Sequence, residues 1–289
     1  MPLPPSQDYV DEPTHDSTQR CVPPLEVRIR SYDRAKLLRL SRMSYSEIAE
    51  TLKRESGYGP SKSQLSGWLR GIHGPLGSAN RFGGEPSPEL AYVIGVKLGD
   101  GSISRKGYNR TIRLQSVDLD FILEFDRCLS KVLGTRRHKP WFDRKRREIH
   151  VEARSVLLYN FLRQSWKDLK SWVEHCSKCV SMFLRGFFDS EGCVSKEGHV
   201  TASNSDIDLL RYTQYLLSLY FEIDSTGPHL NTRAGTKISR RRQVYIRRSD
   251  CYSIYVRVKS LAKFHEAVGF VIERKKIRLL AKLADTWVE

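Results

Sequence analysis

The sequence predicts an α+β protein in which a small all-helical module precedes a larger, duplicated unit. Two observations support this: apolar residues recur at helical spacing over residues 25–75, and one order of helices and strands is written twice after residue 88. A chain of 289 residues can bury the core of such a pair of units. We expect a disordered tail over 1–24, a helical module over 25–75, a linker over 76–88, and repeats over 89–180 and 181–289.

The composition favours a polyanionic partner. Lys and Arg number 49 against 33 Asp and Glu, a formal net charge of +16, and basic groups that meet phosphates release condensed counterions. The sequence has no run of about 18 apolar residues, the length a membrane span needs, and no apolar signal core at its N-terminus. We therefore expect a soluble, intracellular protein of the cytoplasm or nucleoid, with no membrane partner.

The six cysteines predict reduced thiols, because they are too few for a disulfide scaffold at this length. Cys176 and Cys179 form one CxxC pair with no second pair at a matching spacing. His175 and Cys193 could supply further ligands, but a structural zinc normally needs four. We interpret the pair as ordinary helix-packing residues.

Three short helices are expected in the N-terminal module, over residues 33–40, 45–54 and 62–70. Ser61 is placed to cap the third helix, and glycines at 57 and 71 interrupt the pattern. This order is typical of a helix-turn-helix module; a small helical bundle used only for packing is the alternative. The third helix would direct Leu65, Trp68 and Leu69 inward and present to DNA the side chains of Lys62, Gln64 and Arg70.

An internal repeat occupies the rest of the chain. Residues 91–101 (AYVIGVKLGDG) correspond to residues 182–192 (MFLRGFFDSEG). The paired positions are Gly95 with Gly186, Asp100 with Glu191 and Gly101 with Gly192, each 91 residues apart. Residues 116–122 and 204–210 continue the match at a spacing of 88. The spacing between matched residues changes only by a few residues, as a difference in loop length would cause, and this indicates a duplicated fold.

Each repeat has the pattern helix, two strands, helix, two strands, helix. In the second repeat we expect strands at 200–203, 243–247 and 254–258, and helices at 206–221 and 261–268.

The acids that end the two apolar helices are the candidate metal ligands. Gly95 and Gly186 suit close helix contact, and a pseudo-twofold axis would then bring Asp100 beside Glu191. Two such carboxylates repel unless a cation lies between them, and hard oxygen ligands favour Mg²⁺, with Mn²⁺ as the alternative. The competing interpretation is a simple helix stop. A carboxylate at a helix C-terminus opposes the helix dipole, however, at a cost of up to about 1 kcal/mol.

Basic side chains follow the expected strands of both repeats and could line a surface over the major groove. Some of them would only protect edge strands. The candidates for DNA contact are Arg105, Lys106, Arg110, Arg113, Gln115, Arg144, Arg146, Lys196, Arg233, Lys237, Arg240, Arg242 and Arg247.

Residues 90–101 and 183–192 resemble the two motifs of the LAGLIDADG homing endonucleases. The resemblance implies a monomer with two αββαββα halves related by a pseudo-twofold axis, two saddle-forming sheets, and double-strand cleavage of DNA with divalent metal at Asp100 and Glu191. It also implies a basic residue near the site. The first repeat has no lysine just after Leu114, so we assign this role to Lys276, with Lys275 as the neighbouring possibility.

Two other functions fit the same fold: a non-cutting DNA-binding regulator with a helix-turn-helix arm, and an RNA-binding intron splicing helper (a maturase). Loss of either motif acid would favour these alternatives. Both acids are present, which favours the endonuclease. The chain lacks the terminal residues of protein-splicing elements, so we expect a free-standing or intron-encoded enzyme.

Overall fold

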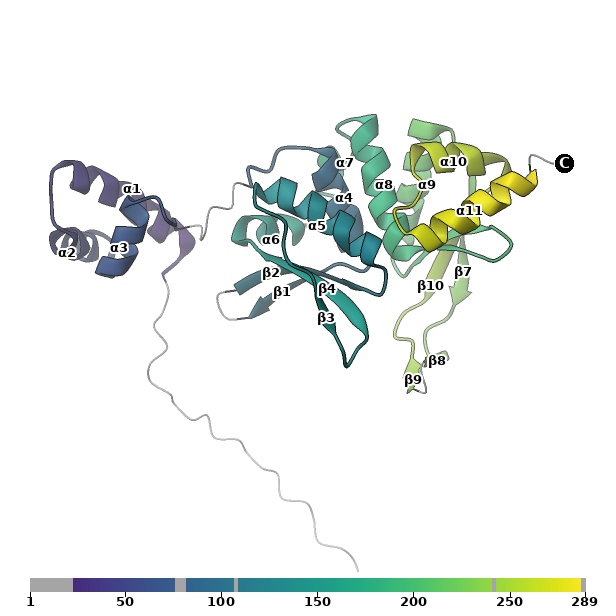
Figure 1. Cartoon of the computed structure of the whole chain (residues 1–289), viewed down its shortest axis with the longest axis horizontal. Coiled ribbons are helices and arrows are strands. Elements are labelled where there is room, and N and C mark those ends of the chain that lie inside the picture. Colours follow the sequence, from purple (N-terminus) through teal and green to yellow (C-terminus); the bar gives the residue numbers. More distant parts are fainter. Residues whose placement is uncertain (1–22, 76–81, 107–108, 241–242, 287–289) are drawn as a thin grey trace, which may run out of the picture. The chain divides into compact units, whose positions relative to one another are not determined.

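The computed structural model describes residues 23–75, 82–106, 109–240 and 243–286. Most of the expected tail and part of the expected linker lie outside these ranges. The chain divides into two compact units, Met1–Pro75 and Leu76–Glu289 (Figure 1). Within the described residues, no helix is both long and apolar enough to cross a membrane.

The first unit is a bundle of three helices: α1 (Leu25–Leu40), α2 (Tyr45–Ser56) and α3 (Lys62–Leu69). The Ser61 hydroxyl accepts a hydrogen bond from the backbone N–H of Gln64, so the predicted cap of α3 is confirmed. Helix α1 begins eight residues earlier than the sequence suggested. The core consists of Ala35, Leu38, Ile48, Leu52, Leu65 and Trp68. Lys62 and Arg70 are exposed.

The first repeat of the second unit follows the predicted order of elements. Its parts are α4 (Pro88–Leu98), β1 (Ser102–Lys106), β2 (Asn109–Ser116), α5 (Leu119–Leu133), β3 (Trp141–Asp143), β4 (Glu148–Arg154) and α6 (Val156–Leu162). The short helix α7 (Lys170–Val173) leads into the second repeat. The four strands form an antiparallel sheet in the order β1-β2-β4-β3.

The second repeat builds an equivalent sheet. Its parts are α8 (Ser177–Glu191), β5 (Gly192–Val194), β6 (Val200–Asn204), α9 (Ile207–Phe221), β7 (Ser225–Thr232), β10 (Cys251–Val256), the 3₁₀ turn η1 (Val258–Ser260) and α10 (Leu261–Ala267). The sheet order β5-β6-β10-β7 matches that of the first repeat strand for strand. The duplicated α+β fold predicted from the sequence is therefore confirmed.

Three features of the second repeat differ from the prediction. Residues 225–232 (STGPHLNT) were not expected as a strand, because they lack apolar alternation and contain proline, yet they pair with β10 as β7. The expected strand at 243–247 pairs instead with β8 (Lys237–Arg240) as β9 (Gln243–Ile246), forming a separate two-stranded ribbon. A further helix, α11 (Glu273–Thr286), follows the last predicted one.

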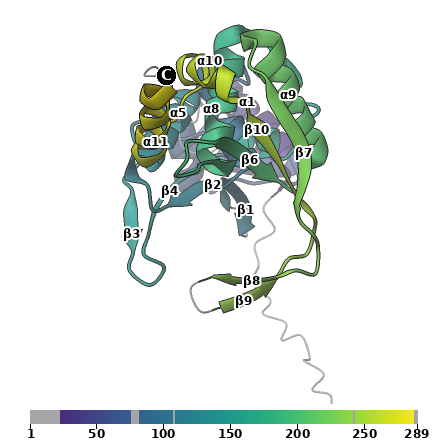
Figure 2. The same ribbon diagram turned by 90° about the vertical axis from the view of Figure 1, so that its right-hand side faces the viewer.

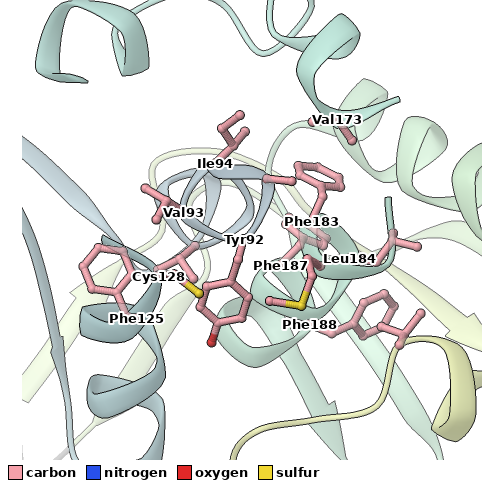
Figure 3. Close-up of a cluster of buried hydrophobic side chains, with 14 of the residues drawn as sticks. Tyr92, Val93, Ile94, Phe125, Cys128, Val173, Phe183, Leu184, Phe187 and Phe188 are labelled. Atoms are coloured by element: carbon pink, nitrogen blue, oxygen red, sulfur yellow. The ribbon is translucent and has the colours of Figure 1, made fainter. Parts of the chain in front are cut away.

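Helices α4 and α8 pack against each other at the centre of the second unit. A Cβ atom on Gly186 would lie 2.5 Å from the backbone oxygen of Tyr92, and one on Gly95 would collide with the backbone oxygen of Phe183. Only glycine permits this backbone approach. Around the contact, Tyr92, Phe183 and Phe187 are fully buried (Figure 3). The rest of the core, from both repeats, is continuous with this pair.

The close helix contact predicts that Gly186→Ala destabilises the second unit. The added methyl group meets backbone rather than a movable side chain, so the helices must separate, at a cost of about 1–3 kcal/mol. The matched control is Gly83→Ala, where the nearest neighbour of the new Cβ is 4.0 Å away. Urea denaturation measures both variants; equal stability of the two would contradict the packing described.

Candidate metal centre and nucleic-acid interface

The ends of the two central helices meet at their acidic residues. Helix α8 extends to Glu191, whereas α4 stops at Leu98 and leaves Asp100 in the turn before β1. A Cβ on Gly99 would lie 3.0 Å from Cγ of Glu191. The turn of the first motif therefore lies directly against the end of the second.

The two motif acids interact electrostatically. Burial and, secondly, the nearby charge of Asp100 together raise the pKa of Glu191 to about 7, while Lys275 acts in the opposite direction. Glu191 is half-buried and Asp100 is exposed. Asp100 and Glu191 offer hard oxygen donors whose negative charge a divalent cation would neutralise. The donor set therefore fits Mg²⁺ or Mn²⁺.

A hollow of about 510 Å³ opens beside these acids. Residues of both repeats and of α11 line this hollow, as expected of a site on a pseudo-twofold axis. Its polar lining includes Asp100, Gln115, Ser116, Asp118, Glu148, Asp189, Ser190, Cys193, Arg274 and Lys275.

Of the two C-terminal lysines, Lys275 lines the hollow and Lys276 does not. The Lys275 ammonium is buried and donates to the backbone oxygens of Asp189 at 2.6 Å and Phe188 at 3.2 Å. Burial lowers its pKa. Lys276, assigned from the sequence, instead places its ammonium 3.7 Å from the carboxylate of Glu273. Along a helix, neighbouring residues point in different directions, so one of the two had to face away.

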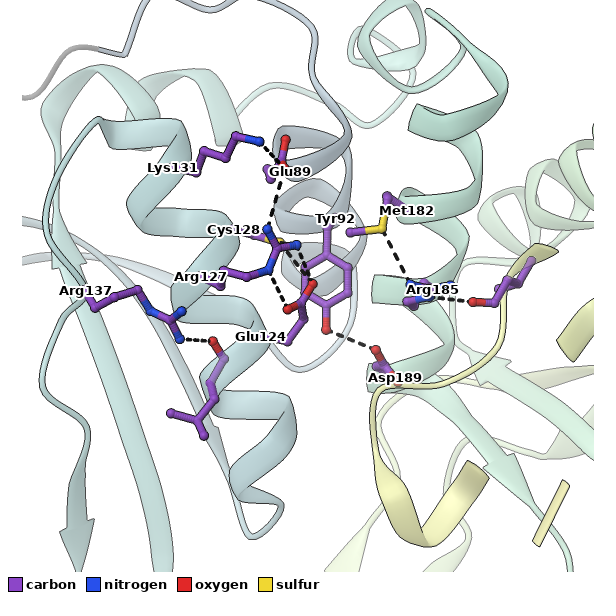
Figure 4. A network of polar contacts seen from close by, with 12 residues as sticks. Glu89, Tyr92, Glu124, Arg127, Cys128, Lys131, Arg137, Met182, Arg185 and Asp189 are labelled. Atoms are coloured by element: carbon purple, nitrogen blue, oxygen red, sulfur yellow. Dashed lines mark hydrogen bonds and ion pairs between the residues drawn. The ribbon is translucent and has the colours of Figure 1, made fainter. Parts of the chain in front are cut away.

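Asp189 joins the two helices and the segment before α11. Its carboxylate accepts hydrogen bonds from the Tyr92 hydroxyl at 3.0 Å and from the backbone N–H of Val271 at 3.0 Å (Figure 4). Burial raises the pKa of this carboxyl to about 7, and Lys275 opposes that rise.

Two contacts that sequence reasoning missed connect α11 to the first repeat. The Arg274 guanidinium binds both carboxylate oxygens of Asp118, at 2.7 and 2.8 Å. The backbone N–H of Glu273 donates to Asp120 at 2.6 Å. The basic run at 274–276 was the available signal, but nothing in the sequence showed that it would meet the start of α5.

The strand register divides the basic residues of the first repeat between two faces. Ile112 and Leu114 of β2 are buried toward the helices, so Arg113 and Gln115 point to the open face. Pairing of β1 with β2 puts Lys106 on the open face too, but Arg105 and Arg110 on the helix-covered face. Arg110 lies over the ring of Tyr159 in α6. The prediction for this hairpin therefore mixed the two faces.

The open face of the first sheet carries aromatic and charged groups. Arg113 pairs with Glu152 of β4 and lies over the ring of Trp141, which stacks on His150. Arg144 and Arg146 are exposed in the turn between β3 and β4.

The second sheet presents a different surface. Its register places Cys193, Thr201, Ser203 and Tyr255 on the open face, none of them charged. The basic residues of this repeat that were predicted to contact DNA lie in its turns and in the ribbon β8–β9, which projects beyond the sheet (Figure 2). Lys196, Arg233 and Lys237 are exposed there and Arg247 is half-buried, while Arg242 and the side chain of Arg240 lie outside the described residues.

Known proteins resemble this chain in sequence and in fold. A family model described as a LAGLIDADG-like domain matches residues 178–269. The uncharacterized protein MJ0398 of Methanocaldococcus jannaschii is 34% identical over 249 residues, which cover 84% of this chain and 89% of that protein. A second uncharacterized protein of that organism, MJ0314, is 32% identical over 136 residues, 43% of this chain and 51% of the relative.

Among solved structures, I-DmoI in complex with DNA and Mn has a TM-score of 0.46 and 15% identity, covering 63% of this chain and 96% of its own. The N-terminal LAGLIDADG domain of WhiA has a TM-score of 0.41 and 18% identity, covering 65% and 85%. The sequence matches and the two motifs at the helix pair carry the assignment. The chain belongs to the LAGLIDADG family and holds both motifs in a single polypeptide.

Proposed function

We propose that this protein is a site-specific, metal-dependent endonuclease that cuts both strands of DNA as a monomer. The observation that carries the proposal is the meeting of Asp100 and Glu191 at the ends of α4 and α8, where the charge of one raises the pKa of the other. A carboxylate pair near a pseudo-twofold axis is suited to cleaving both strands of a duplex, because the two strands are themselves related by twofold symmetry. Membership in the LAGLIDADG family supports the same class of function.

The chemistry follows from the groups around the hollow. A divalent cation held by Asp100 and Glu191 would lower the pKa of an attacking water and stabilise the leaving oxygen. Lys275 supplies positive charge within the hollow and holds the end of α8 through two backbone oxygens. Gln115 lines the hollow from the first repeat, where the sequence offers no lysine. Lys275 is therefore our candidate for the basic residue that steadies the phosphate.

The two open sheet faces would recognise the duplex by different means. Arg113 and Lys106 on the first sheet are placed for phosphates or guanine edges, whereas Thr201, Ser203 and Tyr255 on the second offer hydroxyl groups. The basic ribbon β8–β9 would extend the footprint along the backbone. The same proposal includes further contacts to DNA from the first unit, through Lys62, Gln64 and Arg70.

Intron RNA binding is the second candidate function, and one surface favours it. A hollow of about 580 Å³ on the helical side of the fold is lined by aromatic and basic residues together with Ser171 and two acids: Trp166, Lys170, Ser171, Glu174, Asp208, Arg211, Tyr212 and Tyr215. Trp166 stacks on Tyr212 with ring centroids 5.1 Å apart, and the Lys170 ammonium lies over both rings. Aromatic and basic groups together suit unpaired bases.

The endonuclease proposal predicts metal-dependent double-strand breaks in a plasmid library that carries randomised inserts. Asp100→Asn and Glu191→Gln should each abolish the breaks, because each removes a cation ligand. Glu222→Gln, an exposed acid that pairs with Lys263, should cut like the wild type. Sequencing of linearised plasmids identifies the site. Tight DNA binding without cutting under any divalent metal would indicate a regulator, and selective binding of intron RNA a splicing helper.

Metal binding should strengthen as the pH rises through about 7. Because the pKa of Glu191 is raised from 4.5 to about 7, the metal-free fold loses stability as the pH rises from about 4.5 to about 7, and the full cost of ionising Glu191 is present above that. A cation binds the ionised form and relieves this cost, so Mg²⁺ or Mn²⁺ should raise the melting temperature more at pH 8 than at pH 6. Differential scanning fluorimetry measures the shift. Glu191→Gln should remove most of the pH difference, and an identical shift at both pH values in the wild type would argue against Glu191 as a ligand.

Two arginines on one strand test the proposed DNA face. Arg113→Ala should weaken binding by about tenfold and reduce the salt dependence by about one counterion, because its guanidinium is on the open face. Arg110→Ala, three residues earlier on the helix-covered face, should leave the affinity within about twofold. Fluorescence anisotropy with a labelled duplex at several salt concentrations measures both. A larger loss for Arg110 would exclude this sheet face as the interface.

A further inference from the structure

Three side chains with soft or borderline metal-ligating atoms meet at the turn between α7 and α8. They are His175, Cys176 and Cys179, and one ligand atom from each lies within 4.8 Å of the other two. His175 and Cys176 are exposed, whereas Cys179 is buried. The cluster therefore combines a fixed inner thiol with two outer groups that can adjust their rotamers.

The start of α8 holds the two thiols in place. Cys176 caps the helix, with its Sγ accepting a hydrogen bond from the backbone N–H of Cys179 at 3.4 Å. The two sulfur atoms are also 3.4 Å apart. A helix N-terminus favours negative charge, and this backbone N–H together with His175 lowers the pKa of Cys176 to about 7. On the other side of the turn, the Tyr212 hydroxyl donates to Glu174 at 2.8 Å.

The separation of the two sulfur atoms is close to that around a tetrahedral metal ion. With metal–sulfur bonds of about 2.3 Å and a metal–nitrogen bond of about 2.0 Å, neighbouring ligand atoms lie about 3.5–3.8 Å apart. The observed sulfur–sulfur distance of 3.4 Å is within a few tenths of an ångström of that range. We propose that His175, Cys176 and Cys179 form a site for Zn²⁺ or another thiophilic divalent cation, with water at the fourth position.

The proposed site is separate from the carboxylate centre. Cys176 caps one end of α8 and Glu191 ends the other, and a helix of 15 residues spans about 22 Å. The ligand sets also differ in kind, because thiolates select zinc-like ions and carboxylates select Mg²⁺. One helix would thus hold a thiophilic ion at its N-terminus and a hard ion at its C-terminus, and the bound thiophilic ion would tie the α7–α8 turn to the helix.

Titration of the full-length chain with Co²⁺ tests the site. The cysteines are kept reduced with a phosphine, because a thiol reductant would itself bind the metal. The wild type should develop thiolate-to-cobalt charge-transfer absorption that saturates at one equivalent and disappears when Zn²⁺ is added. Cys176→Ser should lose the absorption, and His175→Ala should weaken the Co²⁺ affinity by about tenfold or more. Cys193→Ser, at an exposed cysteine just beyond the opposite end of α8, serves as the control and should keep it.

Two further variants separate this proposal from the endonuclease. Asp100→Asn and Glu191→Gln should retain the charge-transfer absorption in full, whatever they do to DNA cleavage. Circular dichroism checks that each variant is folded. Absence of the absorption in folded wild type, or its persistence in Cys176→Ser, would overturn the thiophilic site.

Discussion

The backbone contact between α4 and α8 is the constraint on which the second unit depends. Gly95 and Gly186 let each helix approach the carbonyl groups of the other, and the cores of both repeats close around that seam. The same contact fixes the C-terminal ends of the helices, so Glu191 at the end of α8 and Asp100 in the turn after α4 are held near each other. Packing and candidate chemistry therefore share one origin: a substitution that separates the helices would also separate the acids.

The duplication is close in topology but unequal in detail. Both sheets have the same strand order, yet the open face of the first carries Arg113 and Lys106, whereas the open-face residues Cys193, Thr201, Ser203 and Tyr255 of the second are uncharged. At the centre, Glu191 is half-buried and has Lys275 nearby, whereas Asp100 is exposed. Helix α11 adds to this inequality, because its Lys275 binds the end of α8 in the second repeat, whereas its Arg274 pairs with Asp118 of the first. We infer that the two strands of a bound duplex would meet different surroundings.

The repeat, the Ser61 cap, the glycine contact between the helices and the positions of the two acids could be predicted from the sequence. The repeat and the acids follow from regular spacing, and the cap and the glycine contact follow from residue types with one dominant structural role. Strand β7 could not be predicted because pairing with β10, not its own alternation, holds it extended. The faces of Arg105 and Arg110 depend on a register that only the assembled sheet defines. Lys275 and Lys276 are adjacent in sequence, and only the packing of α11 distinguishes them. His175, Cys176 and Cys179 are close in sequence and are interpreted from it as packing residues, because the sequence does not show that their ligand atoms lie within 4.8 Å of one another.

The most direct test of the central claim is the location of Mn²⁺ by anomalous X-ray diffraction from crystals soaked at pH 8. We expect an anomalous peak between the carboxylates of Asp100 and Glu191 that is lost in crystals of Glu191→Gln. A peak bound elsewhere, with no density between these two side chains, would contradict the paired-carboxylate centre and the endonuclease function that rests on it.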